Sequence, residues 1–380
     1  MDFTFSEEQL LIKQAAKDYA ERELIKDVLE RDAMAEIPWQ HIKNLADLGF
    51  FGIMVDPKYG GGGMDTLSYV MAIEEISKID ASMGVILSVH NSLPCYGIQK
   101  YGTEEQKEKY LPDLASGRKI GAFLLSEPEA GSDATSQKTL AEDKGDHYLL
   151  NGTKNWISSA NCGSVYIVMA QTYPDLSTRG INAFIVEKEW PGISLSPHED
   201  KMGLRSSDTH SVMFTDCKVP KENRIGEDGF GFKFAMKLLE GGRNSIAAQA
   251  TGIAGGAFDR ALQYAQERKA FGKLLIDHQA IAFKLADMYV KLEASRNFVY
   301  KAAWLKDHGQ PYGLASSMAK LFCAEAAMWI TTEAVQIHGG YGYVKEYHVE
   351  RLMREAKVTQ IYEGTSEIQK IVISRALRKE

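Results

Sequence analysis

Residues 361–370, near the C-terminus, carry the residue types best suited to acid–base chemistry, in the order IYEGTSEIQK. Glu363 stands between Tyr362 and Gly364, and the residues on both sides follow helix-like patterns. A carboxylate at such a break is either a solvated turn residue or a general base directed into a pocket, where a positioned carboxylate can remove a proton. The local sequence leaves both interpretations open.

Several other chemistries have no motif in this sequence. The nine histidines show no HExxH or comparable spacing, so no metal site is predicted. No GxSxG motif indicates a serine hydrolase, and the glycine run at 60–63 lacks the Lys-Ser/Thr of a phosphate-binding P-loop. No GxGxxG opens a βαβ unit, so any flavin or nucleotide must be bound without a Rossmann fold.

The composition limits the partners and the compartment. The 380 residues are 44% hydrophobic, which is enough for a large core, and the net charge of -7 argues against a general nucleic-acid-binding surface. The four cysteines are far apart and form no CxxC, which is typical of a reducing compartment. No apolar run reaches the ~18 residues of a membrane span, and the acidic, helix-like N-terminus resembles no targeting peptide. We therefore expect a cytoplasmic protein that contacts neither membrane nor nucleic acid.

Hydrophobic patterns divide the chain into three parts and predict an α+β fold. Residues 1–120 read as an N-terminal α-helical domain that begins with a capping box from Ser6 to Gln9. Residues 121–230 hold several runs rich in β-branched and aromatic residues, which predict a middle antiparallel β-barrel or sandwich domain.

Within that β region, Asn151-Gly152 separates two strand-like runs and predicts a hairpin turn. Residues 231–380 return to helical spacing and predict a C-terminal four-helix bundle. One of its long helices is expected to stop at Gly339-Gly340.

Five segments, in this order, resemble the acyl-CoA dehydrogenase family of flavoenzymes. They are GAFLLSEPEAGSD at 121–133, LNGTKNWIS at 150–158, ERKAFGKLLIDHQAIAFKLADM at 267–288, QIHGGYGY at 336–343 and IYEGTSEIQ at 361–369. The resemblance covers nearly the whole chain in the same α–β–α order, and is greatest to the short-chain (butyryl-CoA) members. It implies FAD as the cofactor, which the protein must bind and orient.

The resemblance also implies which residues hold FAD. Ser126 and backbone amides would bond the polar edge of the flavin, Trp156 would lie near it, and the Ser158 hydroxyl would bond N5. Glu129 stands where many relatives have glycine, so the turn there is expected to differ. The implied cofactor-binding residues are Leu124, Leu125, Ser126, Gly131, Ser132, Trp156, Ile157, Ser158, Arg268, Phe271, Gln279, Gln336, Ile337, Gly339, Gly340, Thr365 and Glu367.

In the family, the contacts that match 268–279 and 336–340 come from a neighbouring subunit. Arg268 suits a pyrophosphate because the planar guanidinium can bind two oxygens at once. The resemblance therefore implies a homo-oligomer, a homotetramer built as a dimer of dimers.

For the reaction, the resemblance makes Glu363 the catalytic base. It would remove the α-proton of an acyl-CoA thioester while FAD N5 accepts a hydride from the β-carbon, giving the 2-enoyl-CoA. The backbone N–H of Glu363 would stabilise the enolate, and burial would raise the pKa of the carboxyl toward neutrality. Some relatives place the base just before the arginine that matches Arg243, where this chain has Gly242. The implied substrate-binding residues are Ser132, Glu240, Arg243, Tyr362 and Gly364.

The acyl group is less tightly defined. In glutaryl-CoA dehydrogenases an arginine in the acyl-pocket helix pairs with the distal carboxylate, but residues 81–97 here contain no Arg or Lys. An unpaired carboxylate would be costly to bury there, so straight short-chain, branched and alicyclic acyl groups are favoured.

Three further alternatives stay open at this point. They are a glutaryl-CoA-type dehydrogenase, an oxidase of the same architecture, which is expected to be longer, and a catalytically silent CoA-binding protein on the same fold. The intact Glu363, Ser158 and Arg243 argue against a silent protein. An electron-transferring flavoprotein is the expected electron acceptor.

Overall fold

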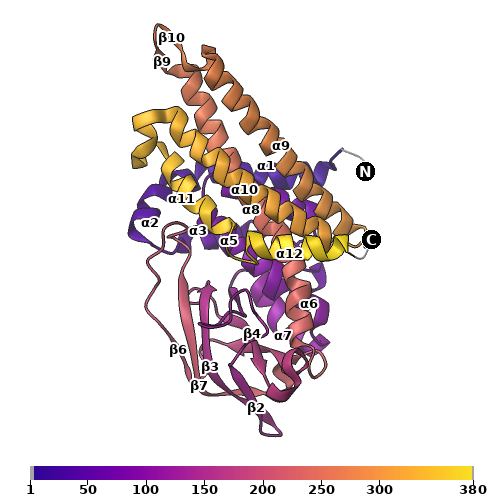
Figure 1. Ribbon diagram of the computed structural model, residues 1–380. Helices are drawn as coiled ribbons and strands as arrows, with labels where there is room; N and C mark the ends of the chain where they lie inside the picture. Colours follow the sequence, from indigo (N-terminus) through magenta and orange to yellow (C-terminus); the bar gives the residue numbers. More distant parts are fainter. Residues whose placement is uncertain (1–3, 379–380) are drawn as a thin grey trace.

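The computed structural model describes residues 4–378, in which the sheet of the middle segment forms one end of the molecule and most of the helices form the other (Figure 1). The first helix begins at the predicted capping box, where Gln9 N–H donates to Ser6 Oγ and Ser6 N–H donates to Gln9 Oε1. The N-terminal helices are α1 (Glu7–Arg22), α2 (Val28–Met34), α3 (Trp39–Asp47), α4 (Thr66–Ser77), α5 (Ala81–His90), α6 (Tyr96–Tyr101) and α7 (Glu104–Ala115).

The middle segment forms one eight-stranded sheet in the order β6-β7-β3-β2-β4-β5-β8, with β1 beside β4. Most neighbouring strands are antiparallel, as predicted, whereas β1 and β2 each pair with β4 in parallel. The strands are β1 (Gly121–Leu124), β2 (Leu140–Asp143), β3 (His147–Ser158), β4 (Val165–Gln171), β5 (Ile181–Glu187), β6 (Ile193–Leu195), β7 (Thr209–Pro220) and β8 (Arg224–Ile225).

The predicted hairpin at Asn151-Gly152 is wrong, because β3 runs straight through both residues. The register with β7 shifts between Leu150 and Gly152, which marks a bulge. Asn151 binds across to the partner strand, since its Nδ2 donates to Asp216 Oδ1 and its Oδ1 accepts from the Asp216 N–H. The Asn-Gly pair therefore bends a long strand and does not reverse the chain.

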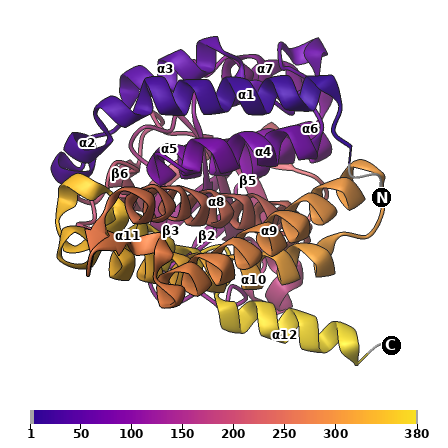
Figure 2. The same cartoon turned by 90° about the horizontal axis from the view of Figure 1, so that it is seen from above.

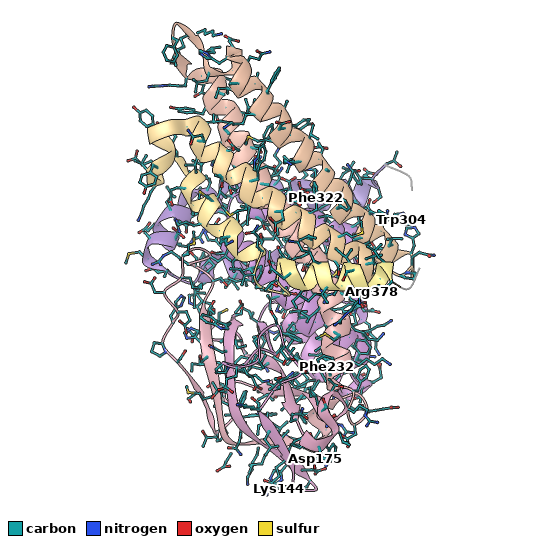
Figure 3. All side chains as sticks on the ribbon, in the orientation of Figure 1. Lys144, Asp175, Phe232, Trp304, Phe322 and Arg378 are labelled. Atoms are coloured by element: carbon teal, nitrogen blue, oxygen red, sulfur yellow. The ribbon has the colours of Figure 1, made fainter. Side chains whose placement is uncertain are left out.

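The C-terminal helices pack on each other and on the N-terminal layer. They are α8 (Gly231–Glu267), α9 (Gln279–Asp307), α10 (Gly313–His338), α11 (Val349–Thr359) and α12 (Ser366–Leu377), with the short hairpin β9 (Lys269–Ala270) and β10 (Lys273–Leu274) after α8. Helix α10 ends at His338 and Gly339 follows as its C-cap, as predicted. Phe322 of α10 (Figure 3) lies 5.0 Å from the ring of Phe298 on α9, centroid to centroid.

Seen from above, the helices lie in layers (Figure 2). Helix α1 contacts α4, α4 contacts α8, and α8 contacts α10. One hydrophobic core cluster runs through these helical layers. A second is formed mainly by side chains of the sheet, among which Leu124, Leu150 and Val168 are fully buried. Among residues 4–378, no helix is both long and apolar enough to cross a membrane.

The predicted domain limits at 120/121 and 230/231 fall beside the start of β1 at Gly121 and the start of α8 at Gly231. We keep the ranges 1–120, 121–230 and 231–380 as proposed domains.

Candidate active site

Glu363 lies in the short loop between α11 and α12, in a backbone conformation that few residues adopt. Its φ is +54° and that of Gly364 is +92°, so two successive residues are left-handed. A non-glycine residue in this region is strained and persists only where its surroundings hold it. The Gly364 carbonyl accepts hydrogen bonds from Lys320 Nζ at 2.7 Å and from Gln369 Nε2 at 2.8 Å. These two bonds fix the turn that points Glu363 inward.

The carboxylate of Glu363 is enclosed although the residue as a whole is only half-buried. Its Oε2 is buried and has no hydrogen-bond partner among the described residues. Burial raises the pKa of Glu363 to about 7, while the charges of Arg243 and Lys320 oppose that rise. This environment argues against a solvated turn residue and favours a group that accepts a proton near neutral pH.

Gly242 of α8 lies directly against this carboxylate. A methyl group built on Gly242 would overlap Glu363 Oε2 and would come within 3.4 Å of Leu93. Position 242 on α8 and Glu363 in the α11–α12 loop therefore face the same space. The other neighbour, Tyr362, donates its hydroxyl hydrogen to Gln249 Oε1.

Arg243 and Glu240 continue the same face of α8. Arg243 is only 8% exposed, its Nη1 lies 3.4 Å from Ser317 Oγ, and its Nε has no partner in the described chain. Burial lowers its pKa, and the charges of Glu240 and Glu363 counter that effect. Buried cations are normally paired, so an incompletely bonded guanidinium fits a site that a polar ligand completes.

The segment after β1 is held in place by the buried side chain of Lys154, which was not among the predicted site residues. Lys154 is fully buried, and its Nζ donates to Glu127 Oε1 at 2.7 Å, to the Leu125 carbonyl at 3.1 Å and to Gln137 Oε1 at 3.1 Å. The strand alternation contains a signal for it, because Tyr148, Leu150 and Lys154 are the buried positions of β3 before its second bulge. A lysine on the buried face of a strand requires a partner carboxylate.

The predicted cofactor-binding residues of this segment range from buried to exposed. The Ser126 carbonyl accepts from Asn155 N–H at 2.8 Å, while Gly131 and Ser132 are exposed. A methyl group built on Gly131 would meet nothing within 4 Å, so the space beside it is open. Glu129, which departs from the family pattern, forms an exposed ion pair with Lys138. Leu124 is buried and Leu125 is half-buried.

Trp156 stands at a second bulge of β3. The register with β7 shifts between Lys154 and Ile157, and Trp156 has a φ of +60°. As a result the indole is 62% exposed although Ile157 beside it is buried and Ser158 is half-buried. A bulge that turns a large aromatic ring outward next to open space suits a planar ligand.

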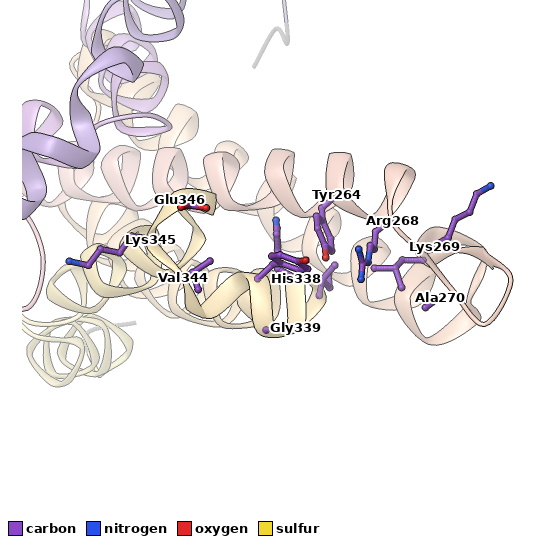
Figure 4. A pocket seen from close by; sticks show the side chains of 13 residues that line it. Tyr264, Arg268, Lys269, Ala270, His338, Gly339, Val344, Lys345 and Glu346 are labelled. Carbon is purple, nitrogen blue, oxygen red and sulfur yellow. The ribbon is translucent and has the colours of Figure 1, made fainter.

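Arg268, Ile337, Gly339 and Gly340 line a separate cavity of about 780 Å³ (Figure 4). Tyr264, His338 and Tyr341 contribute aromatic walls, and the Arg268 guanidinium lies 5.4 Å from the centre of the Tyr341 ring. Phe271, Gln279 and Gln336 are close in sequence to the residues that line this cavity, and all three are exposed. Phe271, in the β9–β10 hairpin, is 98% exposed.

The chain does not bring this cavity together with the segment after β1. The β9–β10 hairpin projects from one end of the molecule, and the sheet forms the other end (Figure 1). Thr365 and Glu367 instead lie beside Glu363, where Thr365 Oγ1 caps α12 by accepting from Ile368 N–H at 3.3 Å and Glu367 is exposed in the first turn.

Comparison with known proteins agrees with this arrangement of helices and sheet. The models described as acyl-CoA dehydrogenase N-terminal, middle and C-terminal domains match residues 6–118, 122–217 and 229–378. The fold is that of a class of flavoprotein oxidoreductases, and the chain belongs to the acyl-CoA dehydrogenase family.

Individual relatives are similar over their full length. The short-chain specific acyl-CoA dehydrogenase of Clostridium acetobutylicum is 49% identical over 98% of this chain and 99% of that protein. The structure of butyryl-CoA dehydrogenase from Megasphaera elsdenii matches with a TM-score of 0.98 and 46% identity over 100% of both chains. A chain of a structure described as electron transferring flavoprotein of Acidaminococcus fermentans, in work towards a mechanism of flavin-based electron bifurcation, matches with a TM-score of 0.99 and 48% identity over 100% of both chains.

Proposed function

We propose that this enzyme uses FAD to dehydrogenate short-chain acyl-CoA thioesters to 2-enoyl-CoA, with Glu363 as the base that takes the α-proton. The observation that carries the proposal is the Glu363 carboxylate, whose Oε2 is buried, lies against Gly242 and has no hydrogen-bond partner within residues 4–378. A pKa of about 7 leaves a substantial fraction ionised at neutral pH while keeping the group basic enough to accept a carbon-bound proton.

The backbone at the same residue supplies the electrophilic half of the site. The N–H of Glu363 donates to no acceptor among the described residues, so it is free to bond a thioester oxygen. A fixed N–H aimed at an oxygen that becomes negative stabilises the enolate-like transition state. Gly364 next to it has no side chain to block the approach of the thioester.

The residues around Trp156 and around Arg268 fit FAD. When bound, FAD supplies the acceptor for the hydride that leaves the β-carbon. Trp156 offers an exposed ring, and Ser126, Ser158 and the open space at Gly131 offer polar contacts beside it.

The cavity around Arg268 offers a cation and aromatic walls for the pyrophosphate and adenosine end. Because that cavity lies at the opposite end of the chain, we propose that it completes the site of a neighbouring subunit in a homotetramer.

The acyl pocket is proposed between α4, α5 and α8. Residues of α5 and the following turn that could line it are fully or almost fully buried: Met83, Val85, Ile86, Leu87 and Leu93. Leu93 reaches the space beside Gly242 and Glu363, because its Cδ2 would lie 3.4 Å from a methyl group built on Gly242. With no lysine or arginine between 81 and 97, a glutaryl group would lack a partner for its second carboxylate, so that alternative is not favoured.

An electron-transferring flavoprotein is the proposed acceptor of the electrons. Two relatives support this, because the Acidaminococcus structure and the caffeyl-CoA reductase-Etf complex subunit CarC of Acetobacterium woodii are both named with such a protein. The four cysteines are free and buried, which supports the proposal of a reducing, cytoplasmic location.

The direct test is anaerobic titration of the purified protein with butyryl-CoA. The protein is expected to be yellow with stoichiometric FAD, and its flavin absorbance is expected to bleach on addition of substrate. A colourless protein that ignores added FAD, or a yellow one that binds acyl-CoA without bleaching, would contradict the proposal.

A further inference from the structure

Lys320 of α10 is fully buried, yet its ammonium is directed at the turn that carries Glu363. Its Nζ donates to the Gly364 carbonyl at 2.7 Å. A buried lysine is rare unless it has a partner, and here the hydrogen-bond partner is a neutral carbonyl next to the Glu363 carboxylate. Packing alone does not explain a charge at this place, because an apolar side chain of the same length would fill the space without the cost of desolvation.

The same carbonyl has a second, uncharged donor. Gln369 is also fully buried, and its Nε2 donates to the Gly364 carbonyl at 2.8 Å. The turn would keep one hydrogen bond without Lys320, so the distinctive contribution of Lys320 is its charge.

The electrostatic surroundings of Glu363 make that charge effective. Burial lowers the pKa of Lys320 to about 8 and raises that of Glu363 to about 7, and each charge opposes the shift of the other. The ionisable groups that face this pair are Arg243 of α8, Tyr69 of α4, Tyr362 of the same loop, Glu325 of α10 and Glu367 of α12. Of these, only Arg243 is a second cation.

We propose that Lys320 is a positioning residue for Glu363: its ammonium holds the Gly364 carbonyl and its charge favours the ionised, proton-accepting carboxylate. The inference rests on the proposed role of Glu363 as base. It predicts that loss of the ammonium charge moves the ionisation of Glu363 to higher pH, whereas loss of a hydrogen bond alone does not.

The experiment uses α-proton exchange in the FAD-loaded enzyme. Acetyl-CoA has α-protons but no β-carbon, so it can exchange protons with deuterated water without transferring a hydride. Exchange is measured by mass spectrometry from pH 5.5 to 9 for the parent, Lys320→Met and the matched control Gln369→Leu, which removes the uncharged donor from the same carbonyl. Circular dichroism and flavin content confirm that each variant is folded and loaded.

The acidic limb of the exchange profile is expected to move up by about one pH unit in Lys320→Met, because an opposite charge nearby typically shifts a carboxyl by 1–3 units. A change in pKa from about 7 to about 8 would lower the rate roughly fivefold at pH 7 and leave it nearly unchanged at pH 9. In Gln369→Leu the limb is expected to stay in place, even if the overall rate falls.

A limb that stays within about 0.3 units of the parent in Lys320→Met, or that moves equally in Gln369→Leu, overturns the inference. If Lys320→Met does not fold, Lys320→Gln keeps a donor without the charge and is expected to show the same shift, with the same outcome overturning the idea. A folded parent enzyme with no exchange, or exchange that survives in Glu363→Gln, would instead refute Glu363 as the base.

Discussion

Replacing Glu363 by glutamine separates the proton-accepting oxygen from the other contributions of this side chain. The two side chains are nearly isosteric, so the packing against Gly242 and Leu93 should survive. The left-handed turn should also survive, because the bonds that hold it reach the Gly364 carbonyl and not the carboxylate. FAD and acyl-CoA binding are therefore expected to persist.

Flavin reduction, by contrast, is expected to fall by at least ~10²–10⁴-fold, the usual cost of losing a positioned general base. At 1.36 kcal/mol per tenfold, this corresponds to about 3–5 kcal/mol of barrier. Gly242, which faces Glu363 Oε2 from α8, has no side chain that could take the proton instead. Tight coupling between proton and hydride removal would make the loss larger.

The assay is the single-turnover rate of anaerobic flavin bleaching at saturating butyryl-CoA. Glu108→Gln serves as the matched control, because Glu108 is an exposed glutamate on α7. A rate for Glu363→Gln within about threefold of the parent would remove Glu363 from the mechanism, since general-base loss costs far more than that. Placing Gly242→Glu on top of Glu363→Gln then tests whether a carboxylate from α8 restores part of the rate.

The remaining predictions concern stability, assembly and substrate. Because the pKa of Glu363 is raised, its contribution to stability is fully present below pH ~4.5 and is lost as pH rises through about 7. At pH 8, Glu363→Gln should therefore have a free energy of unfolding roughly 3 kcal/mol above that of the parent, and a higher unfolding temperature. At pH 4.5 it should show no such gain. An equal gain at both pH values would refute the assigned pKa. Arg268→Ala should weaken both FAD retention and assembly, and sedimentation that shows an intact, fully loaded oligomer would count against a shared site. Gly242→Ala should displace the Glu363 carboxylate and slow bleaching without loss of FAD, and an unchanged rate would show that the two residues are not in contact. Saturated C4–C6 acyl-CoAs should bleach the flavin faster than glutaryl-CoA or palmitoyl-CoA, and faster bleaching by glutaryl-CoA would overturn the argument from residues 81–97.

Features encoded by local patterns could be predicted from the sequence. The capping box at Ser6, the end of α10 before Gly339 and the α–β–α order all depend on residues close to each other in the chain. The family motifs likewise singled out Glu363, and the structure shows its carboxylate buried. The one clear local error was Asn151-Gly152, whose turn preference was overridden because Asn151 found partners on β7.

The tertiary structure decided how Glu363 is supported and charged. In the sequence, Lys320 is one lysine within a helical pattern, and Gln369 is one polar residue after the motif. Only the packing of α10 against the loop before α12 brings Lys320 Nζ to a carbonyl that is 44 residues away in the chain. The pKa of Glu363 has the same origin, because burial and the neighbouring charges of Arg243 and Lys320 come from helices α8 and α10. Sequence therefore determined which residue is proposed to carry the chemistry, whereas long-range packing determined its ionisation, since desolvation and charge proximity depend on distance in space and not along the chain.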